Sequence, residues 1–313
     1  MSGAIGKRSS TAVNYNEAVA AFGIRPAGYR LPDETRVGTV RLQVGDLERS
    51  LEYYMRVLGF HVLSRDEQRA GLASHGEARA LVEVVEKRGV KPVPRGGLLG
   101  LYHFAILLPD RAALGRFVAH LADLGVYAGS ADHDVSEAMY LSDPDGLGIE
   151  VYADRPRTAW RSDSTGQLVM TTAPLDVRSL VAAAGGAPWT GMPPGTTIGH
   201  VHLHVGDLGA AEAFYHRALG FDKIVWNYPG ALFLSAGGYH HRLGTNTWSA
   251  GPPADERHAR LLSWELLVPR RADAEAAARS LAAAGHVPAN EADAWTVDDP
   301  WGTPLRIVSG SES

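Results

Sequence analysis

Cysteine is absent from the 313-residue chain. Its absence excludes disulfide scaffolds, thiol nucleophiles, and zinc or iron–sulfur sites with cysteine ligands. Long hydrophobic runs are also absent. No apolar stretch approaches the roughly 18 residues that a membrane span requires, and the N-terminal segment has no apolar core of the kind found in signal peptides. We therefore expect a cytoplasmic protein with no membrane partner.

The chain also lacks a strong excess of charge of one sign. Its formal net charge is −5, from 30 Lys and Arg against 35 Asp and Glu, and the basic residues are scattered. We therefore expect no nucleic-acid partner. Histidine, by contrast, is plentiful at 13 residues. Any bound metal must be held by histidines and carboxylates.

A fourfold internal repeat organises the chain. The segment VGTVRLQVGDLERSLEYYMRVLGF, which starts at Val37, aligns without a gap with IGHVHLHVGDLGAAEAFYHRALGF, which starts 161 residues later at Ile198. Two fainter copies start at Tyr102 and Leu262. The chain therefore contains four modules, numbered 1 to 4, which begin near residues 37, 100, 197 and 260.

Each module is predicted to fold as a strand, a helix and three further strands. In module 3, Val201, Leu203 and Val205 alternate with histidines, which is typical of a strand with one apolar face. A GDL turn then precedes a helical pattern, and short strands bounded by glycine follow. One βαβββ unit cannot close its own sheet. We therefore expect an α+β fold in which the four modules pair into two open-barrel cups with the helices outside.

The segments between the modules set the expected domain boundaries. Residues 36–153 contain modules 1 and 2, and residues 197–310 contain modules 3 and 4. A connector with Pro, Gly and Ser covers 154–196, and residues 1–35 are expected to form an N-terminal tail. The repeat thus accounts for the whole chain apart from the tail and the connector.

Equivalent positions of the modules point to a metal site. The inward-facing residues of the first strands are, in module order, Thr39, His103, His200 and Ser263. On the last strand, after a DP-x-G turn, module 2 has Glu150 and module 4 has Arg306. Modules 2 and 3 thus supply two histidines and one carboxylate. This is the ligand set of non-haem Fe(II) oxygenases, which leaves positions open for substrate and dioxygen.

Each of these residues also has an ordinary structural explanation. A single strand histidine is more often a hydrogen-bonded structural residue than a ligand, but His103 and His200 occupy equivalent positions of two modules. Glu150 lies in the otherwise apolar strand LGIEVY, where an unpaired buried carboxylate is costly. A cation explains it better than exposure to solvent. His202 and His204 share the inward face with His200 and are expected to line the cup or meet the connector.

The ligand set also predicts how the modules pair. If module 1 paired with 2 and module 3 with 4, His103 and Glu150 would lie in a different cup from His200. Pairing of module 2 with 3, and of module 1 with 4, brings all three residues into one cup, which is the expected active cup. A domain-swapped dimer is the alternative way to assemble the same site.

The sequence resembles the vicinal-oxygen-chelate (glyoxalase/bleomycin-resistance/extradiol dioxygenase) superfamily, and most closely the bacterial catechol 2,3-dioxygenase family of type I extradiol enzymes. The resemblance covers about residues 36–309 and rests on the repeat and on the segments GHVHLHVGDL, SAGGYHHRLGTNTW and SDPDGLGIEVYADRP. It implies Fe(II), with Mn(II) as the alternative, held by residues that match His103, His200 and Glu150. In many extradiol enzymes the complete site lies in modules 3 and 4, and this chain departs from that pattern.

The resemblance also implies three residues that act on the substrate. The family's acid–base histidine is the second one in a strand written roughly His-His-x-x-x-Phe, which matches His241 in YHHRLG. A register shifted by one residue would put His240 there instead. A tyrosine ten residues before the ligand glutamate matches Tyr140, and a histidine upstream of it matches His133. The structural alternatives are a core tyrosine, a solvent-exposed loop histidine and a histidine on a surface hairpin.

The resemblance implies cleavage of a catechol-like aromatic diol next to its hydroxyl groups, with dioxygen as the second substrate. Asn246 and Trp248, just after HHRLG, are expected to line the substrate pocket, although a core position would suit the tryptophan equally well. We expect a homo-oligomer.

Two alternative functions use the same fold. A glyoxalase-like metal-dependent isomerase or lyase usually has four protein ligands with two carboxylates, and the module 3 segment HHRLGTN offers no acid as the fourth ligand. A metal-free small-molecule binding or resistance protein would leave Glu150 in need of another buried partner. Both alternatives stay open at the level of sequence, and metal analysis distinguishes them from the dioxygenase.

Overall fold

The computed structural model describes residues 22–291 and 293–310. The first 21 residues of the expected tail lie outside this part of the chain. All four modules have the same order of elements, with a strand followed by a helical segment and three strands. Within the described residues, no helix is both long enough and apolar enough to cross a membrane.

The bounds of the elements follow the repeat. Module 1 consists of β1 (Arg36–Val44), α1 (Leu47–Tyr53) with its π-helical continuation η1 (Tyr54–Leu58), β2 (His61–Arg65), β3 (Arg69–Ala73) and β4 (Val82–Glu86). Module 2 consists of β5 (Gly100–Leu107), α2 (Arg111–Leu124), β6 (Gly129–Asp132), β7 (Ser136–Ser142) and β8 (Gly148–Asp154). The connector carries η2 (Arg157–Ala159) and α3 (Val177–Ala183). Module 3 consists of β9 (Thr197–His204), α4 (Leu208–Ala211) with its π-helical continuation η3 (Glu212–Ala218), β10 (Asp222–Val225), β11 (Ala231–Ser235) and β12 (Leu243–Asn246). Module 4 consists of β13 (Arg260–Val268), α5 (Arg271–Ala283), β14 (Ala289–Glu291), β15 (Ala294–Asp298) and β16 (Pro304–Ser309).

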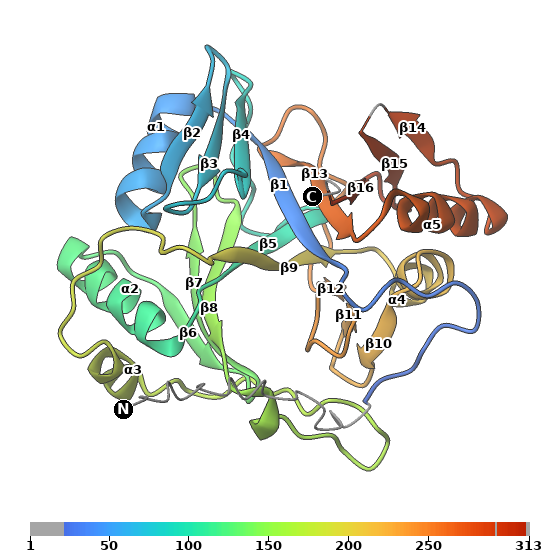
Figure 1. Cartoon of the computed structure of the whole chain (residues 1–313). Coiled ribbons are helices and arrows are strands. Elements are labelled where there is room, and N and C mark those ends of the chain that lie inside the picture. Colours follow the sequence, from blue (N-terminus) through green and yellow to red (C-terminus); the bar gives the residue numbers. More distant parts are fainter. Residues whose placement is uncertain (1–21, 292, 311–313) are drawn as a thin grey trace, which may run out of the picture.

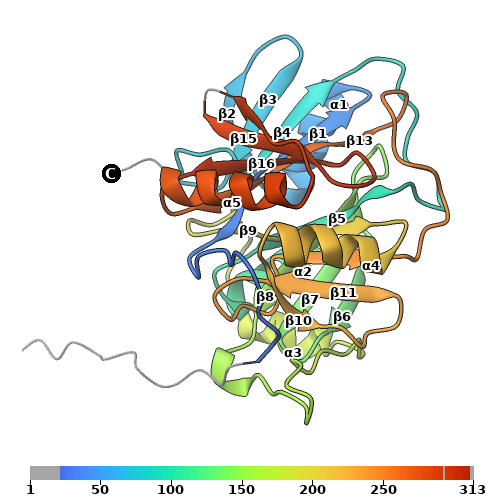
Figure 2. The same ribbon diagram turned by 90° about the vertical axis from the view of Figure 1, so that its right-hand side faces the viewer.

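The strands form two curled eight-stranded sheets (Figure 1). One sheet has the order β14-β15-β16-β13-β1-β4-β3-β2 and joins modules 4 and 1, and the other has the order β10-β11-β12-β9-β5-β8-β7-β6 and joins modules 3 and 2. The first strands of two modules pair antiparallel at the centre of each sheet, β1 with β13 and β5 with β9. Figure 2 shows α4 and α5 on the outer side of the sheets. The expected α+β fold of paired βαβββ modules is confirmed.

Alternation along the central strands separates the core from the cups. In β9, Val201 and Leu203 are fully buried in a core cluster that also contains residues of the other sheet and of the helices. His200 and His202 alternate with them and line a cavity on the opposite face of the strand. Since side chains along a strand alternate between its two faces, the core and the site share the same strands.

Two buried tyrosines connect modules that belong to different sheets. Tyr54 on η1 donates a hydrogen bond to Asp143 Oδ2 in module 2 (3.3 Å), and Tyr215 on η3 donates one to Asp299 Oδ2 in module 4 (2.9 Å). Each aspartate belongs to a DP-x-G turn, and its other carboxyl oxygen accepts backbone N–H groups of that turn. Burial raises the pKa of Asp143 to about 7. The tyrosine hydroxyls therefore satisfy buried acids and tie the two sheets together.

The described part of the tail packs against module 3. Ile24 exchanges backbone hydrogen bonds with Lys223. Arg30 donates two side-chain hydrogen bonds to Asp222, at 2.8 and 2.7 Å. Leu31 is buried in the core. This stretch is therefore an ordered part of the fold.

Removal of either tyrosine hydroxyl is expected to destabilise the protein without disturbing the cup of modules 2 and 3. Tyr54→Phe and Tyr215→Phe should each lower the free energy of unfolding by about 1–2 kcal/mol, because each leaves a buried carboxyl group with one partner fewer. The measurement is urea denaturation, with the exposed Tyr127→Phe as the control. Since the two contacts share no residue, the losses should add in the double variant. Wild-type denaturation midpoints for both single variants would contradict this account.

Candidate metal centre

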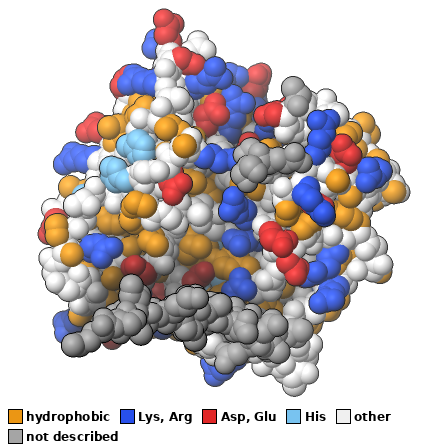
Figure 3. All heavy atoms as spheres, viewed as in Figure 1, with side chains coloured by type: hydrophobic (Ala, Val, Ile, Leu, Met, Phe, Trp, Pro, Cys, Tyr) orange, Lys and Arg blue, Asp and Glu red, His pale blue; other side chains and the backbone are white. Residues whose placement is uncertain are grey.

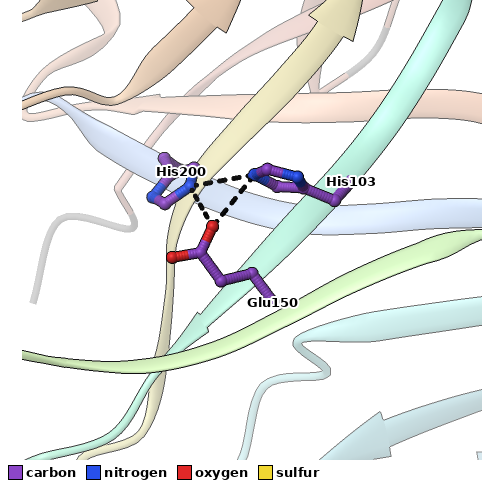
Figure 4. A group of neighbouring side chains, drawn as sticks. All are labelled: His103, Glu150 and His200. Carbon is purple, nitrogen blue, oxygen red and sulfur yellow. Dashed lines mark hydrogen bonds and ion pairs between the residues drawn. The ribbon is translucent and has the colours of Figure 1, made fainter. Parts of the chain in front are cut away.

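Three side chains from neighbouring strands converge on one point (Figure 4). His103 lies on β5, which is flanked by β9 with His200 and by β8 with Glu150. Glu150 Oε2 lies 3.0 Å from His103 Nε2 and 3.2 Å from His200 Nε2, and the two nitrogens are 3.3 Å apart. In the part of the chain that the structure describes, this is the one group of three or more such side chains that could hold a metal ion.

The spacing of the three ligand atoms suits a bound cation. Metal–ligand bonds of roughly 2.1 Å that meet at about 90–110° separate the ligand atoms by about 3.0–3.4 Å. Without a cation, both imidazoles would have to donate from Nε2 to the same carboxylate oxygen. Two imidazoles and one carboxylate on one side of an ion form the face that Fe(II) oxygenases use. The donor set therefore fits a divalent metal.

For His200 and Glu150, burial and the contacts between the groups favour the protonation states that a metal requires. The exposed fractions of His103, Glu150 and His200 are 5%, 3% and 1%. Burial lowers the pKa of His200 to about 4, so its imidazole is neutral at pH 7. Burial alone would raise the pKa of Glu150, but the adjacent imidazoles hold that pKa well below its usual range. Neutral imidazole and ionised carboxylate are the forms that bind a metal.

The strand register explains why the candidate site offers three ligand side chains. Glu150 on β8 pairs with Ala105 on β5, and the equivalent pair in module 3 is Gly244 on β12 with His202 on β9. A Cβ at Gly244 would lie 2.8 Å from the His202 ring. The position that would supply a second carboxylate therefore has neither a side chain nor space for one.

Ion pairs occupy the equivalent positions of modules 1 and 4. Arg41 on β1 pairs with Glu83 on β4, and Glu265 on β13 pairs with Arg306 on β16. The side-chain N–O distances are 3.2 Å for Arg41–Glu83 and 3.7 Å for Arg306–Glu265. On the face of the molecule that Figure 3 shows, Lys and Arg side chains likewise lie among Asp and Glu side chains. The guanidinium groups of Arg41 and Arg306 therefore neutralise Glu83 and Glu265. Neither first strand of this sheet has a histidine at the position of His103 and His200.

The ligand side chains line a cavity of about 290 Å³ between modules 2 and 3. Its aromatic residues are Tyr102, Tyr140, Tyr228, Phe233 and Trp248. The connector adds Met170, Thr171 and Thr172 to the wall. Apart from Tyr140 and Trp248, these residues were not expected from the sequence. Tyr102 lies on β5 and Phe233 on β11, whereas Tyr228 and the three connector residues lie outside the strands. No position of the repeat marks these side chains as part of a cavity wall.

His133 and Tyr140 form a hydrogen-bonded pair in the cavity wall. His133 lies between β6 and β7, and Tyr140 on β7 lies directly opposite Glu150 on β8. His133 Nε2 is 2.6 Å from the Tyr140 hydroxyl, and its Nδ1 is 2.6 Å from the Thr171 carbonyl oxygen. Because a carbonyl oxygen only accepts, Nδ1 of His133 carries a proton and donates it to Thr171, while Nε2 shares a hydrogen bond with the Tyr140 hydroxyl. Burial and the nearby Glu150 raise the pKa of Tyr140 well above its usual range, so its hydroxyl stays protonated.

His241 reaches the cavity and His240 lies behind it. The centre of the His241 ring is 4.0 Å from that of His200. Burial, reinforced by the neighbouring histidines, lowers the pKa of His241 well below its usual range. The strand expected around the two histidines begins only at Leu243, so both lie in the loop after β11. Two glycines with positive φ, Gly237 and Gly238, turn the chain ahead of them.

The two residues expected to contact the substrate occupy different layers. Trp248 lines the cavity and is 48% exposed. Asn246 is fully buried behind the cavity wall. Its Nδ2 donates to His202 Nε2 (2.9 Å), and its Oδ1 accepts from His204 Nδ1 (2.6 Å). Asn246 therefore orients two histidines of β9 and does not itself line the cavity.

Known proteins resemble this chain in sequence and in fold. The family profile described as the Glyoxalase/Bleomycin resistance protein/Dioxygenase superfamily matches residues 36–151 and 197–303. The chain is 44% identical over 272 residues to the catechol-2,3-dioxygenase of Bacillus subtilis (strain 168), and the match covers 86% of this chain and 95% of that protein.

Solved structures share the fold at low sequence identity. A proposed dioxygenase of Bacillus subtilis subsp. subtilis (strain 168) superposes with a TM-score of 0.63 at 11% identity, covering 91% of this chain and 87% of that one. Glyoxalase I from Zea mays superposes with a TM-score of 0.53 at 18% identity, covering 88% and 92%. These matches extend over nearly the whole of the four-module arrangement.

Glu150→Gln is expected to abolish tight metal binding while leaving the fold intact. The amide keeps the shape of the side chain but removes the charge that a divalent ion needs. Affinity should fall by more than the roughly 10- to 100-fold that changes behind the ligands cost. Metal analysis after Fe(II) or Mn(II) loading measures the loss. In thermal unfolding the wild type alone should gain stability from excess metal, by about 2.7 kcal/mol at 100 times the Kd.

The matched control is Glu265→Gln, which changes a partly buried glutamate of the other sheet. This variant should retain wild-type metal content. Full metal occupancy in Glu150→Gln would remove Glu150 from the ligand set.

Proposed function

The chain belongs to the Glyoxalase/Bleomycin resistance protein/Dioxygenase superfamily, and from this premise we propose that it is an extradiol dioxygenase. Its substrate is a catechol-like aromatic diol, whose ring it opens by breaking the C–C bond next to the two hydroxyl-bearing carbons. Both atoms of dioxygen enter the ring-opened product. The observation that carries this proposal is the three-ligand face of His103, His200 and Glu150 inside a cavity. The catechol-2,3-dioxygenase relative supports it.

Fe(II), with Mn(II) as the alternative, is the metal that this ligand set would hold. The bound metal would supply the electron transfer that dioxygen needs in order to react with the diol. The neutral His200 imidazole and the ionised Glu150 are ready to bind it without first losing a proton. Because the protein offers three ligands on one side, the remaining positions stay open to small molecules.

His241 is the proposed acid–base residue. It lines the cavity beside His200, and the low pKa of its buried imidazole keeps the ring neutral at pH 7, with one nitrogen free to accept a proton. A catechol hydroxyl in the cavity could pass its proton to the ring. The imidazolium so formed is a strong acid in this buried position and returns the proton readily. Such a reversible acceptor is what general acid–base catalysis requires.

His133 and Tyr140 are proposed to hold the oxygen atoms of the substrate. The Tyr140 hydroxyl keeps its proton and lies 2.6 Å from His133 Nε2. A substrate oxygen with developing negative charge would compete for that proton. Fixed donors in a buried site stabilise such charge more strongly than water does. Thr171 fixes the ring of His133 through its carbonyl group, so the pair is already oriented.

The cavity wall suits an aromatic ring. Tyr102, Phe233 and Trp248 provide flat apolar surfaces near the metal ligands, and aromatic pairs prefer tilted or offset contacts of the kind that such a wall offers. We assign Trp248 to substrate binding because it lies at the partly exposed side of the cavity. The volume of about 290 Å³ is close to the lower limit of about 300 Å³ for ligand sites.

The other two functions on this fold are less well supported. A glyoxalase-like isomerase with four protein ligands would need a carboxylate where this chain has Gly244. A metal-free binding protein would bury Glu150 with two imidazole nitrogens directed at one of its oxygens. The ligand geometry therefore favours the three-ligand dioxygenase.

The direct test is anaerobic loading with Fe(II), followed by addition of oxygen and a panel of catechols. Ring opening should produce a yellow muconic semialdehyde-type product, and ¹⁸O₂ should label it with two oxygen atoms. Zn(II)-loaded protein is the control, because zinc does not change its oxidation state. Absence of ring cleavage across the panel, together with isomerase activity in nickel- or zinc-loaded protein, would replace this proposal with the isomerase.

His241→Phe should retain the metal but slow ring opening. Loss of a general acid–base group costs typically about 10²- to 10⁴-fold in rate. The measurement is stopped-flow turnover at matched iron loading. His286→Phe is the control, because His286 follows α5 in module 4. Turnover of His241→Phe within twofold of the wild type would exclude His241 as the acid–base residue.

A further inference from the structure

A chain of hydrogen bonds runs from His241 away from the cavity to a carboxylate that the proposed reaction does not use. His241 Nδ1 lies 2.7 Å from His240 Nδ1, and His240 Nε2 lies 2.9 Å from Asp154 Oδ1. His240 is fully buried and does not line the cavity. Asp154 ends strand β8, four residues after the ligand Glu150. Strand β8 therefore carries both the carboxylate of the candidate metal site and the carboxylate at the far end of these hydrogen bonds.

The direction of each hydrogen bond in the chain follows from the chemistry of its ends. A carboxylate only accepts, so the proton of the first contact lies on His240 Nε2. In a neutral imidazole the other nitrogen is then an acceptor. With a neutral His240, Nδ1 can therefore only accept, and the proton of the second contact lies on His241 Nδ1. This leaves His241 Nε2 with a free lone pair.

Asp154 is itself held in place by buried tyrosines. The Tyr239 hydroxyl donates to Asp154 Oδ1 at 3.1 Å, and it lies 2.7 Å from the Tyr152 hydroxyl. The ring of Tyr239 packs against that of His240, with 4.1 Å between the ring centres. The Asp154 side chain is 28% exposed, whereas the imidazole it contacts is fully buried. Asp154 Oδ1 thus accepts hydrogen bonds from His240 and Tyr239, while the carboxylate stays partly exposed to solvent.

We propose that Asp154 and His240 are positioning residues that hold His241 in the tautomer with its Nε2 lone pair available to the substrate. This inference rests on the proposed function, since it assigns a purpose to the tautomer of the acid–base residue. The same donor–acceptor logic explains why two adjacent histidines occur in the loop before β12. His241 lines the cavity. His240 links it to Asp154, so that the carboxylate determines which nitrogen of His241 carries the proton.

Replacement of Asp154 by asparagine is expected to change the tautomer of His241. In Asp154→Asn the amide can donate to His240 Nε2, which moves the His240 proton to Nδ1 and forces His241 to present Nε2–H to the cavity. When the amide instead presents its oxygen, it accepts more weakly than a carboxylate. In either orientation the tautomer of His241 is no longer fixed. Replacement of the carboxylate behind a catalytic histidine by an amide is known to impair catalysis through the wrong tautomer, by about 10⁴-fold in a serine protease.

The experiment combines two measurements on Asp154→Asn. In iron-free, ¹⁵N-histidine-labelled protein, the resonance pair of His241 is assigned by its loss in His241→Phe. In the wild type, Nδ1 should have the shift of a protonated nitrogen and Nε2 that of an unprotonated one. In Asp154→Asn this pattern should reverse or average. In Fe(II)-loaded protein at equal metal content, kcat for catechol cleavage should fall roughly 10- to 10³-fold, with KM within twofold of the wild type.

Two further variants keep the result interpretable. His240→Gln removes the imidazole that links the carboxylate to His241 and should also lower kcat, and it replaces Asp154→Asn should that variant fail to fold. Asp222→Asn is the matched control, because Asp222 is a buried acid of module 3 that pairs with Arg30 on the tail. This control should change neither the ¹⁵N pattern nor kcat.

An unchanged ¹⁵N pattern in Asp154→Asn, or a wild-type kcat despite a changed pattern, would overturn the proposal. Failure of the proposed function gives a different result. In that case the wild type itself cleaves no catechol, while the ¹⁵N measurement still decides whether Asp154 sets the tautomer of His241.

Discussion

The antiparallel pairing of β5 with β9 is the contact on which the site depends. It joins module 2 to module 3, although the connector separates them in sequence. Its register sets Ala105 opposite His200 and His103 opposite His202. His103 and His200 therefore face the same side of the sheet and lie diagonally across the strand pair. The parallel pairing of β8 with β5 then adds Glu150 from the other side. A slip of one residue in either pairing would turn one of these three side chains to the opposite face of the sheet.

The carboxylates at equivalent register positions have different partners in the two sheets. At equivalent register positions, the sheet of modules 1 and 4 pairs Glu83 with Arg41 and Glu265 with Arg306. The sheet of modules 2 and 3 sets Glu150 against two imidazoles and leaves Gly244 at the fourth position. A guanidinium thus faces the acid in one sheet, whereas in the other sheet two imidazoles face it and the group could hold a metal ion. The common fold is therefore compatible with one cup being structural and the other reactive.

Hydrogen-bond direction organises the layer behind the cavity. Groups that can only accept or only donate stand at the end of each chain of contacts, and they set the tautomer of the ring that faces the cavity. The Thr171 carbonyl does this for His133, and Asp154 does it for His241 through His240. These supports come from the connector and from the end of β8. A short cavity wall is thus oriented by segments that lie far apart in the chain.

The fourfold repeat was sufficient to predict the α+β fold and the βαβββ order of each module, because alternation and helical spacing are local properties that each copy repeats. Comparison of equivalent positions also selected His103, His200 and Glu150, the three residues that the structure brings together. Sequence spacing did not reveal that Asn246 lies behind the cavity wall, that His240 and His241 lie in a loop, or that the connector lines the cavity. These features depend on contacts between segments distant in sequence, and such contacts leave no periodic pattern in either partner.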